Sequence, residues 1–304
     1  MRLVLYLLSI IYGTIVILKN TLFDYGLLKS KNHTIPIICI GNLSIGGTGK
    51  TPLTNYIAKL LSPNYKIAIL SRGYKRKSSD FKYVELHSDA SEIGDEPLQL
   101  KQNNPTCIIA VNNNRNNAVK KILTDYPKVN IILLDDGFQH RKITAGLNII
   151  VTPFDKIFTK DTLMPLGTLR EPASEAKRAN IVLISKTPKM TSLNEKQEVL
   201  KKLNLKVHQK GYFSSIIYKK YRCVKNGTTL NNENKYSVTL VTGIANPNHL
   251  RQYLEKKGRI VELIKFSDHH NYTIKDIQKI LRTHNKNKSA KKLILTTEKD
   301  ATKL

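Results

Sequence analysis

Short apolar runs, each bounded by turn-forming residues, recur through the first part of the chain. The runs that predict strands are 35–40, 66–70, 106–111, 129–134, 147–151 and 181–184. Helix-like stretches separate several of them, and this alternation is typical of a mostly parallel sheet wrapped by helices. The first part of the chain is therefore predicted to be an α/β domain with helices on both faces of its sheet.

The pattern changes after residue 187 and then restarts. The polar stretch Thr187–Lys210 predicts one amphipathic helix, and Gly211–Tyr221 and the Asn-rich Lys225–Lys235 are interpreted as extended connectors. Beyond them the sequence predicts a strand at 237–242, a helix at 246–256, a strand at 260–266, a helix at 274–283 and a strand at 292–295. The predicted organisation is an N-terminal helical segment at 1–30, a main domain at 31–210 and a smaller α/β domain at 211–304.

The N-terminal segment is strongly apolar. Leu3–Leu18 carries no charge, is flanked by Arg2 and Lys19, and lacks the small-residue cleavage site of a signal peptide. It is slightly short for a membrane span, so an interfacial or shallowly inserted helix fits best. A buried core helix is the alternative.

Composition narrows the choice of partners. The chain of 304 residues has 50 Lys and Arg against 23 Asp and Glu, for a net charge of +27, so its partner is expected to be acidic. Nucleic acid, anionic lipid and a phosphorylated substrate are all acidic, but the absence of tryptophan, the 7% aromatic content and the lack of aromatic residues interleaved with basic ones weaken the case for nucleic acid. The three cysteines at positions 39, 107 and 223 have no CxxC spacing and are interpreted as reduced structural thiols.

One motif predicts chemistry directly. Residues 46–51 read Gly-Gly-Thr-Gly-Lys-Thr and separate the strand predicted at 35–40 from a helix-like stretch at 53–61. In such a loop the backbone N–H groups converge on phosphate oxygens, Lys50 reaches the β- and γ-phosphates, and the Thr51 hydroxyl ligates Mg²⁺. The chain is therefore predicted to bind ATP or GTP.

The loop departs from the strict P-loop pattern at its first position, where Ser44 replaces glycine. The later glycines still supply the freedom that a close approach of phosphate requires. The predicted nucleotide cradle consists of Ser44, Ile45, Gly46, Gly47, Thr48, Gly49, Lys50 and Thr51.

Acidic residues follow the strand predicted at 129–134. Asp135 and Asp136 occupy the place of a Walker B acid, whose carboxylate must meet the magnesium ion of the phosphate loop. Because successive side chains of a strand point to opposite faces, one aspartate is expected to bind Mg²⁺ and the other to orient loops. The sequence does not decide which aspartate binds Mg²⁺. The alternative to a Walker B element is an ordinary solvated turn.

Further charged residues lie in loops at the ligand-binding end of the predicted sheet. Asp95 and Glu96 open a probable helix, where acids are also favoured by the helix dipole alone. Arg72, Arg115 and Arg170 could clamp phosphates or could be ordinary surface charges.

The second domain contributes the sequence Asp268-His269-His270, which is expected to end a strand. These residues could bind a metal, but adjacent side chains diverge and no third ligand cluster accompanies them. A His–Asp pair that moves a proton is the preferred interpretation.

Several motifs together resemble one family. They are Gly41-Asn42-Leu43-Ser44-Ile45-Gly46-Gly47-Thr48-Gly49-Lys50-Thr51-Pro52, Ser71-Arg72-Gly73-Tyr74, Gly94-Asp95-Glu96-Pro97, Asp135-Asp136-Gly137-Phe138-Gln139-His140, Leu169-Arg170-Glu171, Asp268-His269-His270 and Thr297-Glu298-Lys299-Asp300. In this order they resemble the tetraacyldisaccharide 4′-kinase (lipid A 4′-kinase) family over nearly the whole chain. Family members usually continue into a further strand beyond the position of Leu304.

The resemblance implies a P-loop kinase with a second small α/β domain and an N-terminal membrane helix. It implies transfer of the ATP γ-phosphate, with Mg²⁺, to the 4′-hydroxyl of a tetraacylated glucosamine disaccharide 1-phosphate in lipid A biosynthesis. The expected location is the cytoplasmic face of the bacterial inner membrane, at an anionic lipid surface. The protein is expected to be a monomer that does not bind nucleic acid.

The resemblance also assigns roles to residues. Lys50 and Thr51 handle phosphate and Mg²⁺, and Glu96 and Asp136 help to hold the metal. Asp95 corresponds to the family's proposed base and His269 to its partner. Arg115 and Arg170 correspond to arginines that stabilise charge during transfer. Because Asp95 and His269 belong to different predicted domains, closure of the two domains is expected to assemble the pair.

Two other functions compete with this prediction. A membrane-associated ATPase or GTPase switch that acts on a protein partner would hydrolyse nucleotide slowly and transfer no phosphate to lipid. A basic nucleic-acid-binding protein would bind DNA or RNA with a steep dependence on salt.

Overall fold

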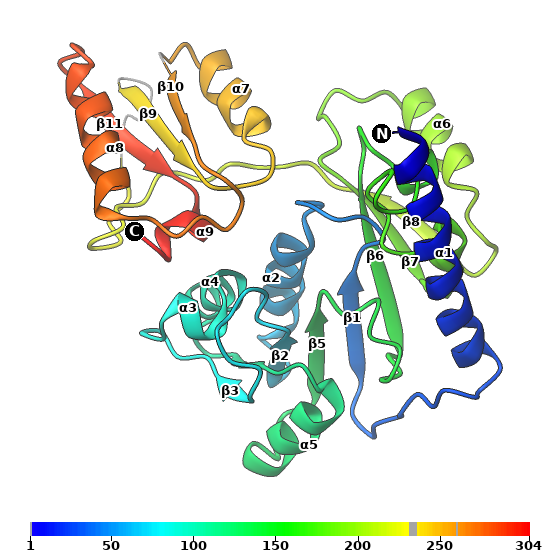
Figure 1. Ribbon diagram of the computed structural model, residues 1–304. Coiled ribbons are helices and arrows are strands. Elements are labelled where there is room, and N and C mark those ends of the chain that lie inside the picture. The colour runs from blue at the N-terminus through cyan, green and yellow to red at the C-terminus, as the bar shows by residue number, and fades with distance from the viewer. Residues whose placement is uncertain (1, 231–235, 260) are drawn as a thin grey trace. The chain divides into compact units, whose positions relative to one another are not determined.

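The structure is a computed structural model that describes residues 2–230, 236–259 and 261–304. The chain divides into two compact units, Met1–Ile216 and Ile217–Leu304, and each is described by itself (Figure 1). The predicted boundaries at residues 30 and 210 stay predictions about domains.

The first unit is built around one eight-stranded sheet with the order β3-β4-β2-β5-β1-β6-β7-β8. Its strands are β1 Ile37–Gly41, β2 Ile67–Ser71, β3 Lys82–Tyr83, β4 Ile108–Val111, β5 Ile131–Asp135, β6 Leu147–Pro153, β7 Ile181–Ser185 and β8 Lys210–Phe213. All pair in parallel except β3, which runs antiparallel to β4. The ends of β1 and β5 therefore lie next to each other, in the middle of the sheet.

Helices cover both faces of this sheet. The helices are α2 Lys50–Leu61, α3 Ala90–Ile93, α4 Asp95–Asn103, α5 Arg115–Asp125 and α6 Leu193–Leu203, with short 3₁₀ helices η1 Phe158–Lys160 and η2 Ala173–Arg178. The apolar sides of α2, α3 and α4 pack on one face, and those of α5 and α6 pack on the other. Because the central strands are buried on both faces, their sequences are almost continuously apolar. The predicted fold class is confirmed.

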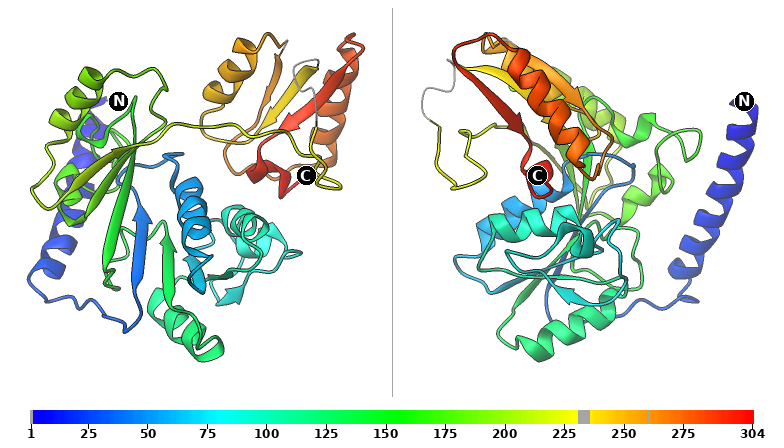
Figure 2. Two further views of the ribbon diagram at one scale, coloured as in Figure 1. Left: turned by 180° about the vertical axis from the view of Figure 1, so that it is seen from behind. Right: turned by 60° about the vertical axis from the view of Figure 1, so that its left-hand side comes forward.

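Helix α1, Arg2–Asp24, lies along the outside of the first unit (Figure 2). It is longer than the uncharged run Leu3–Leu18 and continues through Lys19 to Asp24, within the segment 1–30 that was predicted to hold a helix. Among the described residues it is the one helix whose length and composition would allow it to cross a membrane.

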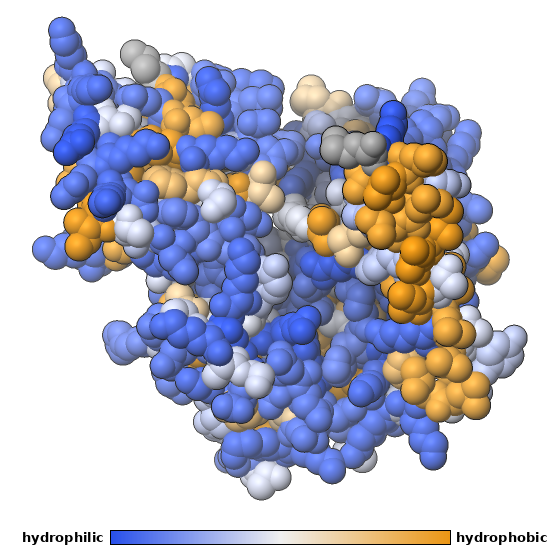
Figure 3. Space-filling model, in the orientation of Figure 1, coloured by the Kyte–Doolittle hydropathy of each residue, from blue (hydrophilic) through white to orange (hydrophobic). Residues whose placement is uncertain are grey.

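Most of the apolar surface of α1 is uncovered. Leu7, Ile11 and Ile15 are all more than half exposed, and they form part of the apolar area that Figure 3 shows over this helix. The residues that face the body are few and mostly small or polar: Ser9, Gly13, Asn20 and Phe23. Helix α1 is therefore not a core helix, which removes that alternative.

The second unit holds a smaller parallel sheet with the order β10-β9-β11. Its elements are β9 Ser237–Thr242, α7 Asn248–Lys256, β10 Val261–Lys265, α8 Ile274–Lys286, β11 Lys292–Thr296 and α9 Glu298–Ala301. Leu254 of α7 packs on one face of the sheet and Ile280 of α8 packs on the other. The predicted elements are confirmed within a few residues, except that residue 260 lies outside the described residues.

One prediction about the connecting segments needs correction. Residues 211–213 are not a free connector but part of β8, which pairs with β7 and extends the large sheet. The sequence signal for strand β8 was weak because Lys210–Phe213 does not contain a long run of apolar residues. The second connector, Lys225–Lys235, stays a prediction: no helix or strand is assigned among its described residues, where Thr229 forms an isolated bridge with Arg222, and residues 231–235 lie outside the described residues.

Candidate nucleotide-binding and phosphoryl-transfer site

The glycine-rich loop connects β1 to α2, as the motif predicts. Gly46 and Gly49 have φ values of 99° and 100°, a region that a residue with a Cβ adopts only with strain. Gly49 is also the N-cap of α2, and no side chain caps this helix. The first backbone N–H groups of α2 and its positive dipole end are therefore available for an anion.

Side chains from the neighbouring strands hold the loop in shape. The amide of Asn42 donates to the Ser44 carbonyl at 2.5 Å and to the Thr48 hydroxyl at 2.9 Å. From the end of β7, the Ser185 hydroxyl donates to the Thr48 carbonyl at 2.6 Å, and the Lys186 ammonium donates to the Gly47 carbonyl at 2.5 Å. These bonds direct loop carbonyls toward the body, so the loop N–H groups can point the other way.

Asp135 ends β5 beside the loop and is almost completely buried. Its Oδ1 accepts a hydrogen bond from the Thr54 hydroxyl of α2 at 2.8 Å. Burial raises the pKa of Asp135 to about 6, although the hydroxyls of Thr54 and Thr51 and the charge of Lys50 favour its ionised form. A buried carboxylate next to the first turn of α2 is the arrangement that a Walker B acid requires.

Asp136 lies at the centre of a cluster of charges. Lys50 Nζ is 3.6 Å from its Oδ1, and Arg170 Nη1 donates to both carboxylate oxygens at 3.1 Å. Burial alone would raise the pKa of Asp136, but Lys50 and Arg170 outweigh it and lower that pKa. The carboxylate is therefore ionised and draws the Lys50 and Arg170 side chains to the loop.

The backbone at Asp136 corrects one expectation. Its φ of 52° is left-handed, so Asp136 has left the strand and the alternation of faces does not apply to it. Both aspartates consequently remain near the end of β5. Asp135 contacts Thr54 of α2, and Asp136 contacts Lys50.

Arg115 is the first residue of α5 and is buried. Its guanidinium donates to the Asn113 carbonyl at 3.2 Å. Burial, assisted by the positive charge of Arg72, lowers the pKa of Arg115 to about 10, which still leaves it charged at neutral pH. The pKa of Arg115 also reflects an attraction to Asp136, so Arg115 and Arg170 both contribute positive charge near this carboxylate.

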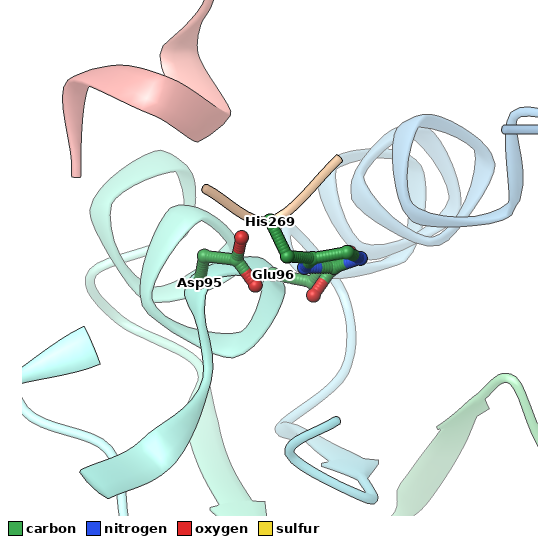
Figure 4. Close-up of side chains that lie close together, drawn as sticks. All are labelled: Asp95, Glu96 and His269. Carbon is green, nitrogen blue, oxygen red and sulfur yellow. The ribbon is translucent and has the colours of Figure 1, made fainter. Parts of the chain in front are cut away.

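Asp95 and Glu96 form the first turn of α4, as the sequence predicts (Figure 4). Asp95 is buried and Glu96 half-buried. The start of this helix packs closely against the loop that follows β2. A Cβ added at Gly94 would lie only 3.1 Å from the Gly73 Cα. Both carboxylates thus belong to the edge of the sheet where β1, β2 and β5 end.

His269 belongs to the second unit and projects from the loop between β10 and α8 (Figure 4). The strand ends at Lys265, so Asp268, His269 and His270 follow the strand and do not end it as predicted. His270 is used structurally: its Nε2 lies 2.9 Å from Asp276 Oδ2, in the capping box of α8.

The segment that carries Arg170 also contacts helix α1. The Tyr12 hydroxyl donates to the Arg170 carbonyl at 2.7 Å, and the Asn20 amide donates to the buried Glu171 carboxylate at 3.2 Å. On its other side, Arg170 N donates to the Leu43 carbonyl at 2.7 Å, just before the glycine-rich loop. The apolar helix and the loop are thus joined through residues 170–171.

Sequence reasoning missed several residues of this site. Asn42, Thr54, Ser185 and Lys186 hold the loop or its acid, yet none was singled out for that role. Ser185 and Lys186 come directly at the carboxyl end of β7, and polar residues at that position in a parallel sheet are a signal that could have identified them.

The doubly covered parallel sheet, the glycine-rich loop at the start of α2 and the acids at the end of β5 define a P-loop nucleotide-binding protein. The sequence profile of the family described as Tetraacyldisaccharide-1-P 4'-kinase matches residues 1–304. The chain belongs to this family.

Individual relatives agree with the family. A Tetraacyldisaccharide 4'-kinase of Bacteroides fragilis is 44% identical over 99% of this chain and 82% of its own length. The enzyme of that name from Flavobacterium johnsoniae is 40% identical over 100% of this chain and 88% of its own length. The crystal structure of LpxK from Aquifex aeolicus in complex with ATP superimposes on this chain with a TM-score of 0.77 and is 30% identical in sequence. The match covers 100% of this chain and 90% of the Aquifex aeolicus chain.

Proposed function

We propose that this chain transfers the γ-phosphate of ATP to the 4′-hydroxyl of a tetraacylated glucosamine disaccharide 1-phosphate, in the synthesis of lipid A. The observation that carries the proposal is the charge cluster of Lys50, Asp136 and Arg170 beside the glycine-rich loop. The family membership and the ATP complex of the Aquifex aeolicus relative support the choice of nucleotide and acceptor.

In this reaction the acceptor oxygen forms a bond to the γ-phosphorus, the bond from that phosphorus to the β,γ-bridging oxygen breaks, and ADP leaves. Negative charge on the transferring group is met by Lys50 and Arg170, which are already held at the loop by Asp136. The backbone N–H groups at the start of α2 bind the remaining phosphate oxygens.

The residues present also fit Mg²⁺. The Thr51 hydroxyl lies in the first turn of α2, and its hydrogen bond favours the ionised form of the buried Asp135 carboxylate. Hydroxyl and carboxylate oxygens are the ligands that Mg²⁺ takes in phosphate sites, and we propose Thr51, Glu96 and Asp136 as its ligands, with Asp135 as an alternative to Asp136. When bound, the ion neutralises phosphate charge and orients the γ-phosphate.

We further propose that Asp95 accepts the proton of the acceptor hydroxyl and that His269 is its partner. The support is the place of Asp95 in the first turn of α4, beside the loop after β2, and the match of both residues to the motifs of the family. Arg115 is proposed to stabilise charge together with Arg170, which its burial near Asp136 supports.

Mass spectrometry of a lipid A precursor incubated with the protein and Mg-ATP tests the function. The expected product is heavier by one phosphate, and its fragments carry the new phosphate on the distal glucosamine. Nucleotide hydrolysis without any phosphorylated lipid would instead favour the ATPase or GTPase switch.

We propose the cytoplasmic face of the bacterial inner membrane as the place of action, with the protein acting as a monomer. The uncovered apolar surface of α1 and the net charge of +27 both suit an anionic lipid surface.

Two acidic substitutions on the exposed face of α1 are expected to weaken membrane binding. Ile11→Glu together with Ile15→Glu removes apolar area worth about 1.5–3 kcal/mol per buried side chain, so partition to anionic vesicles should fall at least about tenfold. The measurement is vesicle flotation at high salt, where attraction between surface charges is screened. Substitution is preferable to deletion of residues 1–20, because Tyr12 and Asn20 contact the segment that carries Arg170.

The matched control is Met190→Glu with Val207→Glu, which adds the same charges at exposed apolar positions outside α1. It should float like the unchanged protein, and both variants should bind ATP normally. Undiminished flotation of the α1 variant would show that the membrane anchor lies elsewhere.

A further inference from the structure

Lys299 makes two contacts in the second unit that the proposed reaction does not yet use. Its Nζ donates to Asp268 Oδ1 at 2.9 Å and lies 3.1 Å from His269 Nε2. The side chains of Lys299 and His269 are only 15% and 12% exposed, so solvent competes weakly for these contacts.

The chemistry of these atoms fixes the direction of the second hydrogen bond. A lysine ammonium has donors and no acceptor, so His269 Nε2 must accept from it. Asp268 Oδ2 is 3.8 Å from the same nitrogen, which is beyond hydrogen-bond distance, so it does not provide a competing acceptor for an Nε2 proton. A neutral ring that accepts at Nε2 carries its proton on Nδ1.

The backbone around His269 is fixed by the same short segment. His269 has a left-handed φ of 61°, and its N–H donates to the Gly243 carbonyl at 3.2 Å. The N–H of Gly243 in turn donates to Oδ2 of the fully buried Asp300 at 3.0 Å. Residues 299 and 300 therefore hold both the ring and the backbone of this loop.

We infer that Lys299 is a positioning residue that holds His269 in the tautomer protonated on Nδ1. His269 then donates a hydrogen bond from Nδ1 and does not itself take the acceptor's proton. Within the proposed function, on which this step rests, Asp95 is the base and His269 orients its carboxylate. The hydroxyl proton passes to Asp95 as the oxygen–phosphorus bond forms.

The test measures the tautomer directly in the full chain. Protein labelled with ¹⁵N-histidine gives ring nitrogen signals by NMR, and His269→Gln identifies the signals of His269 by their loss. In the unchanged protein His269 should be protonated on Nδ1 with Nε2 as acceptor. Lys299→Met should move the proton wholly or partly to Nε2, whereas Lys299→Arg, which keeps a donor, should preserve the original tautomer.

Kinetics on the lipid acceptor provide the second readout. By analogy with partners that orient a functional histidine, Lys299→Met should lower turnover by roughly 10–100-fold and change the Michaelis constant for ATP little. The matched control Lys256→Met removes the same charge from an exposed position of α7 and should change neither the tautomer nor turnover. Circular dichroism confirms that each variant folds.

The outcomes separate this inference from the proposed function. An unchanged tautomer in Lys299→Met, or a doubly protonated ring in the unchanged protein, overturns the inference whatever happens to activity. A tautomer that shifts as expected, combined with normal turnover of His269→Gln, supports the positioning by Lys299 but removes His269 from the reaction.

Discussion

Lys50→Ala is expected to slow phosphoryl transfer by roughly 10²–10³-fold, because one positioned charge partner of the transferring phosphate is lost. In the folded protein Lys50 lies in the first turn of α2, 3.6 Å from Asp136. Without Lys50, Asp136 still pairs with Arg170. More of the Arg170 charge is then neutralised by this carboxylate, and less is available for the transferring phosphate. Turnover at saturating Mg-ATP, measured with the lipid acceptor, checks the result.

The control lies in the same helix. Lys59→Ala removes an equal charge from the exposed last turn of α2 and should leave turnover unchanged. Both variants should unfold at nearly the temperature of the unchanged protein, since Lys50 is not part of the apolar core. Turnover of Lys50→Ala within threefold of the unchanged protein would contradict the proposed role of the loop.

The central strands and the phosphate loop could be predicted because local sequence determines them. Strands such as β1 and β5 are buried on both faces and must be apolar throughout, and the loop needs glycine where φ is positive, at Gly46 and Gly49. The edge strand β8 escaped prediction because it has one neighbour in the sheet and none of its four residues is buried. Its position depends on β7, not on its own pattern.

The contacts that shape the site were less predictable, since they join distant parts of the chain. Arg170 meets Asp136 across 34 residues, and Ser185 meets the Thr48 carbonyl across 137. The sequence predicted that Asp136 follows a strand and that Arg170 lies in a loop at the ligand-binding end of the sheet, and it did not single out Ser185. Only the strand order β5-β1-β6-β7 brings these residues to one edge. The left-handed backbone of Asp136, to which the alternation of strand faces does not apply, has only a weak sequence signal, because aspartate adopts this conformation more often than most residues but still uncommonly.

The proposed pair of Asp95 and His269 should behave as one unit in a double-mutant cycle. Loss of a positioned base typically costs about 10²–10⁴ in rate, so Asp95→Ala is expected to lower turnover by that amount. Residues that act as a unit show strongly non-additive losses. Adding His269→Ala should therefore reduce turnover little further, because a histidine that orients a carboxylate has no role once the carboxylate is gone.

His269→Ala alone should lower turnover more than it raises the Michaelis constant for ATP, since it acts on the acceptor side of the reaction. The matched control is His249→Ala, in α7 of the same unit, which should have no effect on either constant. The cycle is measured on transfer to the lipid disaccharide. Additive losses in the double variant, or a His269→Ala effect confined to ATP, would reject the pair and leave Asp95 as an acid of the Mg²⁺ site.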